Sequence, residues 1–239
     1  MDVQLFIPCF VDQLYPDTAF NMVKVLEKAG CNVRYNASQT CCGQPAYNAG
    51  FQEESKQVCQ KFLQDFKGDD PIVAPSASCV GFVRNYYPKQ LANSSLHHEV
   101  ISTGKRIFEF SEFLVQVLGR EKLGAELHAR ATYHDSCAGL RECRIKEEPR
   151  KLLQQVKGLD MVEMHDVETC CGFGGTFSVK FEPISIGMAE QKVENAVATG
   201  AEYIISTDLS CLMHLQGYIN HKQYPIKTMH LADVLAQGW

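Results

Sequence analysis

Eleven of the 239 residues are cysteines, and eight of them fall into two sets with the same order along the chain. Each set consists of a single cysteine, an adjacent pair followed by glycine, and another single cysteine. Thiolates are the preferred ligands of soft metal centres, chiefly zinc and iron–sulfur clusters. The sequence therefore predicts two metal sites, one held by Cys9, Cys41, Cys42 and Cys79 and the other by Cys137, Cys170, Cys171 and Cys211.

The spacing within each set bears on which metal is bound. Structural zinc sites usually present ligand pairs about two to four residues apart, and that spacing is absent here. Adjacent cysteines suit an iron–sulfur cluster, because neighbouring thiolates can reach different irons. Gly43 and Gly172 follow the pairs and let backbone N–H groups approach cluster sulfurs. Spacing alone favours an iron–sulfur cluster in each half, with zinc as the alternative and unmetallated core cysteines as the weakest interpretation.

The other candidate residues have less specific patterns. Cys31, Cys59 and Cys143 lie outside the two sets, and we expect them to be structural, because free cysteine packs as a small apolar residue. His134 lies three residues before Cys137; it either hydrogen-bonds a cluster or substrate or packs as a core histidine. A nucleophilic cysteine–histidine pair made from these two would leave the paired cysteines unexplained, so we disfavour it.

The two sets belong to an internal repeat. The first single cysteine and the pair are separated by 31 residues in one set and 32 in the other, and the pair and the last cysteine by 36 and 39. Three flanking segments also align: Gly68–Cys79 with Gly200–Cys211, Thr40–Gly43 with Thr169–Gly172, and Phe108–Leu114 with Met229–Leu235. We predict two copies of one unit, residues 1–120 and 121–239.

Each copy alternates short apolar runs with helical patterns, which indicates an α/β fold of parallel sheets flanked by helices. In such sheets ligands bind beyond the carboxyl ends of the strands, and the single cysteines of both sets follow predicted strands. The expected strands are 3–7, 32–35, 72–74, 131–134, 159–164 and 203–206, and the expected helices are 17–29, 45–66, 79–91, 148–156 and 183–198.

The composition excludes several classes of protein. The net charge is −5 and 45% of the residues are hydrophobic, which describes an ordinary globular protein and argues against nucleic acid as the partner. The sequence has no signal-peptide pattern and no apolar run long enough for a transmembrane segment. We therefore expect a cytoplasmic protein, in which the thiols stay reduced.

Four segments carry a more specific resemblance. They are Ile7–Pro16, Cys41–Gly50, Tyr133–Cys137 and Thr169–Lys180. On these segments the chain resembles the CCG-domain family of cysteine-rich proteins, which includes the cysteine-rich subunit of heterodisulfide reductase. It is most similar to the lactate utilisation protein A branch of that family.

This resemblance implies an iron–sulfur subunit of a multi-component system that oxidises L-lactate in the bacterial cytoplasm and passes the electrons onward. It also implies partner subunits, including a ferredoxin-type iron–sulfur protein, and it assigns cluster binding to the eight cysteines of the two sets. No flavin or nicotinamide motif is present; Gly172–Phe177 has phenylalanine where a dinucleotide fingerprint needs its third glycine.

The chain departs from heterodisulfide reductase in one respect. Each unit of the cysteine-rich subunit of that enzyme ends in Cys-x-x-Cys, and five thiolates hold a non-cubane cluster. Here Phe82 and His214 stand at the fifth position, which argues against that cluster and its thiol–disulfide chemistry. Four thiolates per half suffice for a four-iron cluster. His214 is either an alternative ligand of the second unit or a helix-surface histidine.

Overall fold

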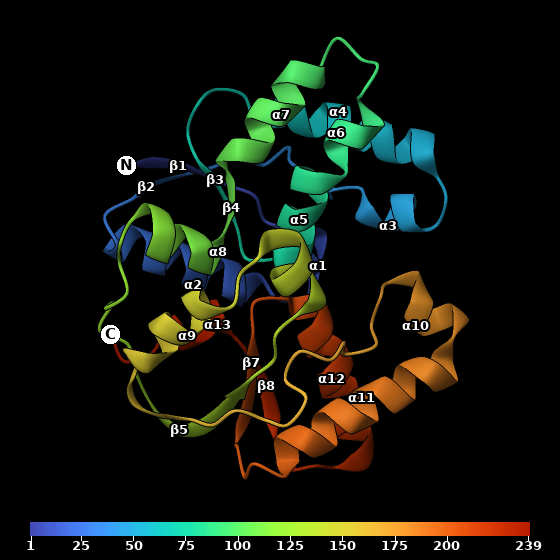
Figure 1. Ribbon diagram of the computed structural model, residues 1–239. Helices are drawn as coiled ribbons and strands as arrows, with labels where there is room; N and C mark the ends of the chain where they lie inside the picture. Colours follow the sequence, from blue (N-terminus) through green and yellow to red (C-terminus); the bar gives the residue numbers. More distant parts are fainter.

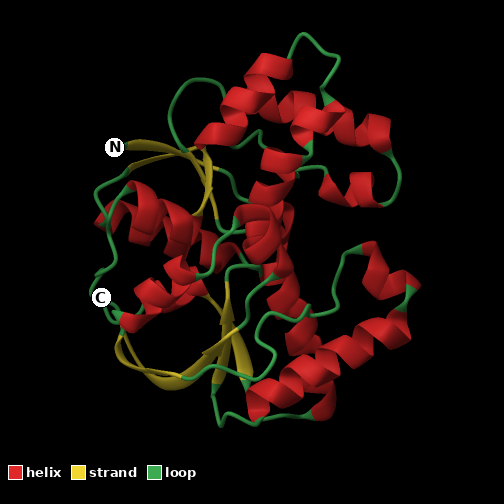
Figure 2. Cartoon of the chain, in the orientation of Figure 1, coloured by secondary structure: helices red, strands yellow, loops and turns green.

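The computed structural model describes the whole chain, residues 1–239, and contains two four-stranded parallel sheets (Figures 1 and 2). The first has the order β2 (Asn32–Tyr35), β1 (Asp2–Leu5), β3 (Ile72–Ala74), β4 (Ile107–Glu109). The second has the order β6 (Lys157–Met161), β5 (Glu126–Tyr133), β7 (Tyr203–Ser206), β8 (Lys227–His230). The two orders are equivalent along the chain, and the predicted α/β class is confirmed.

Parallel strands need crossover connections, and helices provide them. The first half contains α1 (Cys9–Leu14), α2 (Pro16–Lys28), α3 (Gln44–Asn48), α4 (Gln52–Asp65), α5 (Ala77–Asn85), α6 (Tyr87–Gln90), α7 (His97–Arg106), α8 (Phe110–Glu112) and the π-helix η1 (Phe113–Val117). The second contains the π-helix η2 (Ala138–Cys143), α9 (Glu147–Gln154), α10 (Thr176–Lys180), α11 (Glu182–Val197), α12 (Leu209–Lys222) and α13 (Leu231–Leu235). None of these helices has the length and apolar character needed to cross a membrane.

Two of the expected helices are interrupted. The helix expected over 45–66 is divided into α3 and α4, because Gly50 adopts a φ of 93° between them. The helix expected over 79–91 is divided into α5 and α6, with Pro88 in the first turn of α6, a position that proline favours. The outer strands β4 and β8 were not predicted, because β4 runs directly into α8 and β8 contains only one apolar residue, Met229.

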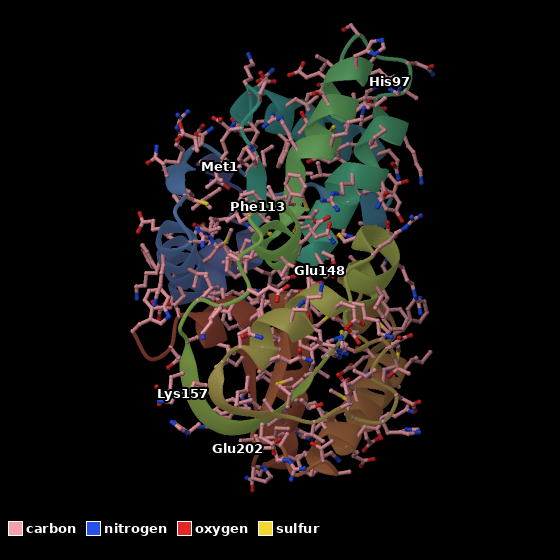
Figure 3. The ribbon with its side chains drawn as sticks, turned by 60° about the vertical axis from the view of Figure 1, so that its left-hand side comes forward. Met1, His97, Phe113, Glu148, Lys157 and Glu202 are labelled. Carbon is pink, nitrogen blue, oxygen red and sulfur yellow. The ribbon has the colours of Figure 1, made fainter.

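The two halves share one hydrophobic core. It joins Val3 and Met22 of the first half to Ile204 and Leu235 of the second. A smaller core lies mainly in the first half, around Phe62. Phe113 and Glu148 lie between the two halves in Figure 3, whereas His97 and Glu202 mark their outer ends. The boundary at residue 120 stays a prediction, because the packing is continuous across it.

Candidate metal centre

All eight cysteines of the two sets line one cavity of about 520 Å³. Residues of α3 and α10 also line the cavity, and these two helices face each other on one side of the molecule (Figure 1). Thus the two sets, which were predicted as separate sites, line a shared space. The lining contains one charged residue, Asp208.

The carboxyl ends of the strands position the single cysteines. Cys9 begins α1 after β1, and Cys79 lies in the first turn of α5 after β3. Cys137 follows β5, and Cys211 lies in the first turn of α12 after β7. This is the edge of each sheet at which the α/β architecture is expected to bind ligands.

In the first set the four sulfurs form two close pairs. The Sγ atoms of Cys9 and Cys41 lie 3.7 Å apart, and those of Cys42 and Cys79 lie 3.5 Å apart. The backbone N–H of Gly43 donates to the sulfur of Cys41 at 3.4 Å. Gly43 has a φ of 88°, a conformation that other residues rarely adopt, so the turn after the pair requires glycine.

The second set repeats this turn. Gly172 has a φ of 94°, and its N–H donates to the sulfur of Cys170 at 3.5 Å. A Cβ atom at Gly172 would lie 2.6 Å from the carbonyl oxygen of Ser185. The Ser185 hydroxyl donates to the Gly172 carbonyl at 2.8 Å, as Ser55 does to Gly43 at 3.3 Å. The two serines are equivalent supports that were not predicted from the sequence.

The sulfurs of each set stabilise one thiolate. Hydrogen bonds from the thiols of Cys42 and Cys9 lower the pKa of Cys41 to about 3. Hydrogen bonds from Cys137 and Cys171 lower the pKa of Cys170 to about 2. The pKa values of the donating thiols are raised, chiefly by the same hydrogen bonds. Each set therefore favours a thiolate among its hydrogen-bonded sulfurs, and this negative charge would attract a cation.

The buried carboxylate of Asp208, which lines the cavity, joins the two halves of the chain. Its oxygens accept hydrogen bonds from the Ser76 hydroxyl and the Ser78 N–H of the first half, both at 3.1 Å. They also accept one from the Ser136 hydroxyl of the second half at 2.5 Å. Each of these segments leads directly into Cys79, Cys137 or Cys211. The repeat aligned Asp208 with Ser76, but nothing in the sequence indicated that the two would be in contact.

Two further polar residues are buried behind the second set. His134 has no exposed surface, and one of its ring nitrogens lies within 4.8 Å of the sulfurs of Cys171 and Cys211. Burial and the positive charge of Lys192 lower the pKa of His134 to about 3. The Lys192 ammonium is also buried and donates to the carbonyls of Asp166 and Val167 at 2.6 and 3.0 Å. Sequence reasoning singled out His134 but not Lys192.

The remaining candidates lie away from the cavity. Cys31, Cys59 and Cys143 are buried free thiols that do not line it, and Cys143 donates to the carbonyl of Ala77 at 3.2 Å. His214 also does not line the cavity; its Nε2 lies 3.2 Å from the Ser185 hydroxyl. His214 therefore contacts the serine that supports the glycine turn, and not the sulfurs.

Comparison with known proteins agrees with the repeat. The profile of the CCG cysteine-rich domain matches residues 3–84 and again residues 131–216. Lactate utilization protein A 1 of Bacillus mycoides (strain KBAB4) is 44% identical over 98% of this chain and 96% of its own length. Lactate utilization protein A of Oceanobacillus iheyensis is 40% identical over the same shares of the two chains.

A solved structure supports the fold alone. The crystal structure of a hypothetical protein from Helicobacter pylori superposes with a TM-score of 0.63 at 13% identity. The match covers all of this chain and 49% of that one, so the present chain spans about half the length of the solved protein. The domain match, the relatives and the duplicated sets of cysteines agree: the chain belongs to the family of cysteine-rich CCG-domain proteins.

Proposed function

We propose that this protein is the iron–sulfur subunit of a multi-component, cytoplasmic system that oxidises L-lactate. The observation that carries the proposal is the convergence of two four-thiol sets on one cavity. The names of the relatives, which are lactate utilization proteins, supply the metabolic role. The eight cysteines of the two sets would bind the clusters, one per half.

The donor set suits such clusters. Iron–sulfur clusters are held by four cysteine thiolates, and each half offers four sulfurs at strand ends. Backbone N–H groups that point at ligand sulfurs tune cluster potentials, and Gly43 and Gly172 provide such groups. A cluster bound by these residues would supply one-electron transfer.

The cavity favours electron transfer over binding of lactate itself. Oxidation of lactate to pyruvate releases two electrons and two protons. A lactate carboxylate calls for a cationic partner such as arginine, and no arginine or lysine lines the cavity. Arg84, the basic residue nearest the first set in sequence, is paired with Glu112 at 2.7 Å. We therefore assign oxidation of the hydroxy acid to a partner subunit and transport of its electrons to this chain, with a ferredoxin-type iron–sulfur protein among the partners.

The proposal is tested by anaerobic purification followed by metal analysis. We expect brown protein that absorbs broadly in the visible region and contains iron and acid-labile sulfide. The matched control is Cys31→Ser, which alters a cysteine outside the two sets. This variant should keep the iron content of the native sequence. Colourless protein that holds stoichiometric zinc after anaerobic reconstitution would contradict the proposal. A strain that lacks the protein should lose growth on L-lactate.

A zinc-stabilised assembly module is the second candidate, and one observation favours it. The sulfur pairs of the first set are separated by 3.5 and 3.7 Å. Zinc–sulfur bonds of about 2.3 Å imply a tetrahedral edge of about 3.8 Å, so each pair could share one metal ion. A zinc module would scaffold partner subunits without redox chemistry, and the same metal analysis distinguishes the two functions.

A further inference from the structure

His134 is a buried polar residue whose side chain has no partner. It follows β5, and its backbone is fixed by a hydrogen bond from its N–H to the carbonyl of Ile205 at 2.8 Å. Its own carbonyl accepts from the Ser206 hydroxyl at 2.9 Å. Neither ring nitrogen makes a hydrogen bond, although both are buried. A buried polar group left unpaired is destabilising, which indicates that the ring is placed for a ligand.

The ring lies against the second set of sulfurs. One of its nitrogens and the Sγ atoms of Cys171 and Cys211 all lie within 4.8 Å of one another, and all three residues are buried. Imidazole nitrogen and thiolate sulfur commonly bind the same metal ion. No other group of three or more histidine, cysteine or acidic side chains in the structure is as closely placed for a metal ion.

The first half has no equivalent of this histidine. The residue three positions before Cys9, as His134 is before Cys137, is Phe6. Phe6 packs edge-on against Phe62 and Phe66, with ring centroids 5.0 and 5.6 Å away. An apolar ring therefore backs the first set of sulfurs, whereas an imidazole with two free nitrogens backs the second.

We propose that His134 binds the metal of the second set through a ring nitrogen. The second site then has four sulfurs and one nitrogen, whereas the first has four sulfurs only. The inference rests on the proposed function for its cluster chemistry. A thiolate donates more charge than a neutral imidazole, so a cysteine in place of His134 would lower the reduction potential of the second centre.

The direct test detects histidine nitrogen at the metal. Protein labelled with 15N-histidine is reconstituted anaerobically with iron and sulfide, reduced, and measured by pulsed EPR. We expect a 15N coupling in the native sequence and in a His214→Gln variant, and its loss in His134→Phe, which reproduces the first half. A His134→Cys variant keeps a ligand at this position and should retain the metal while lowering the midpoint potential of one centre in an optical titration.

The outcomes separate the two proposals. Protein without an iron–sulfur signal contradicts the proposed function. A cluster signal without histidine coupling in the native sequence overturns the assignment of His134 and leaves the proposed function standing. Loading with Co(II), whose visible and EPR spectra respond to nitrogen ligands, tests His134 in protein that takes up no iron. Identical Co(II) spectra for the native sequence and His134→Phe would also overturn the assignment.

Discussion

The two halves of the molecule match in their scaffold and differ in what lies behind their sulfurs. Both sheets have the same strand order, and both cysteine pairs end in a glycine of positive φ whose N–H donates to sulfur. The equivalent serines Ser55 and Ser185 mark matching positions on α4 and α11. Seven residues further along these helices, the first half has Phe62 and the second has Lys192.

Together with Phe6 and His134, these residues give the two sulfur sets different surroundings. The first set is backed by two packed aromatic rings, and the second by an imidazole and an ammonium group. A buried positive charge stabilises added electrons through a low-dielectric interior. The duplication has therefore preserved the glycine turn after each cysteine pair and changed the electrostatics, which is the arrangement that two centres at different potentials would need.

The largest effect should come from removing one ligand in each half. Cys42→Ser should remove the metal of the first half and Cys171→Ser that of the second, because both thiols are buried at the centre of their sets. Each variant should lose about half of the bound iron if each half holds its own cluster, as proposed. Iron and sulfide quantitation gives the result. Complete loss in either variant would show that the two sets hold one shared centre.

Two equivalent helices begin after different buried residues. Glu109 accepts hydrogen bonds from the N–H groups of Ser111 and Glu112 in α8, and His230 accepts one from Ala232 in α13. Burial raises the pKa of Glu109 from 4.5 to about 8. It lowers the pKa of His230 below its usual 6.5.

These shifts predict opposite pH dependences. Between pH 4.5 and about 8 folded Glu109 keeps a proton that the unfolded chain releases, so stability falls as pH rises, by up to about 1.4 kcal/mol per pH unit. Below pH 6.5 unfolded His230 gains a proton that the folded state rejects, so stability falls as pH falls. In urea unfolding at several pH values, Glu109→Gln should reduce the fall in stability as pH rises. His230→Asn should reduce the fall in stability as pH falls. Unchanged slopes would show that burial does not control these groups.

Lys192→Met should destabilise the second half by about 2 kcal/mol, because a buried polar group that loses its partner costs about 1–3 kcal/mol. The carbonyls of Asp166 and Val167, which lead into the second cysteine pair, would both lose their donor. The matched control is Phe62→Met in the first half, an exchange between apolar residues that leaves no polar group unpaired. Urea unfolding under anaerobic, reducing conditions measures both. Equal losses of unfolding free energy in the two variants would show that Lys192 acts only by filling space.

Much of the fold was predictable because the sequence contains two copies of one unit. The repeat and the alternation of apolar runs with helical patterns predicted the α/β class, and β2, β3 and β7 have the predicted bounds. Local breaks were harder to predict. Gly50 ends α3 through its positive φ, and glycine is also tolerated within helices, so its presence alone does not fix a boundary.

The cysteines of the site were predictable and their surroundings were not. A thiol set is recognised from spacing, but the convergence of both sets on one cavity depends on how the two sheets pack. The contacts of Lys192 with Asp166 and of Asp208 with Ser76 join residues 26 and 132 positions apart. No local pattern encodes such pairs, because these residue types are mostly found exposed to solvent.

The smallest effect is expected where the two halves meet. Asp208→Ser copies Ser76, its counterpart in the first half, and removes the carboxylate that accepts from Ser76, Ser78 and Ser136. Loss of these bonds should cost about 1–2 kcal/mol and loosen the segments that carry Cys79 and Cys137. The matched control is Asp233→Ser. It removes a carboxylate of α13 that accepts hydrogen bonds from Thr18 and Asn21 of α2, away from the cavity. Both should lower stability in urea unfolding, and only Asp208→Ser should speed the loss of iron to a chelator. Equal rates of iron loss would show that Asp208 joins the halves without positioning their sulfurs.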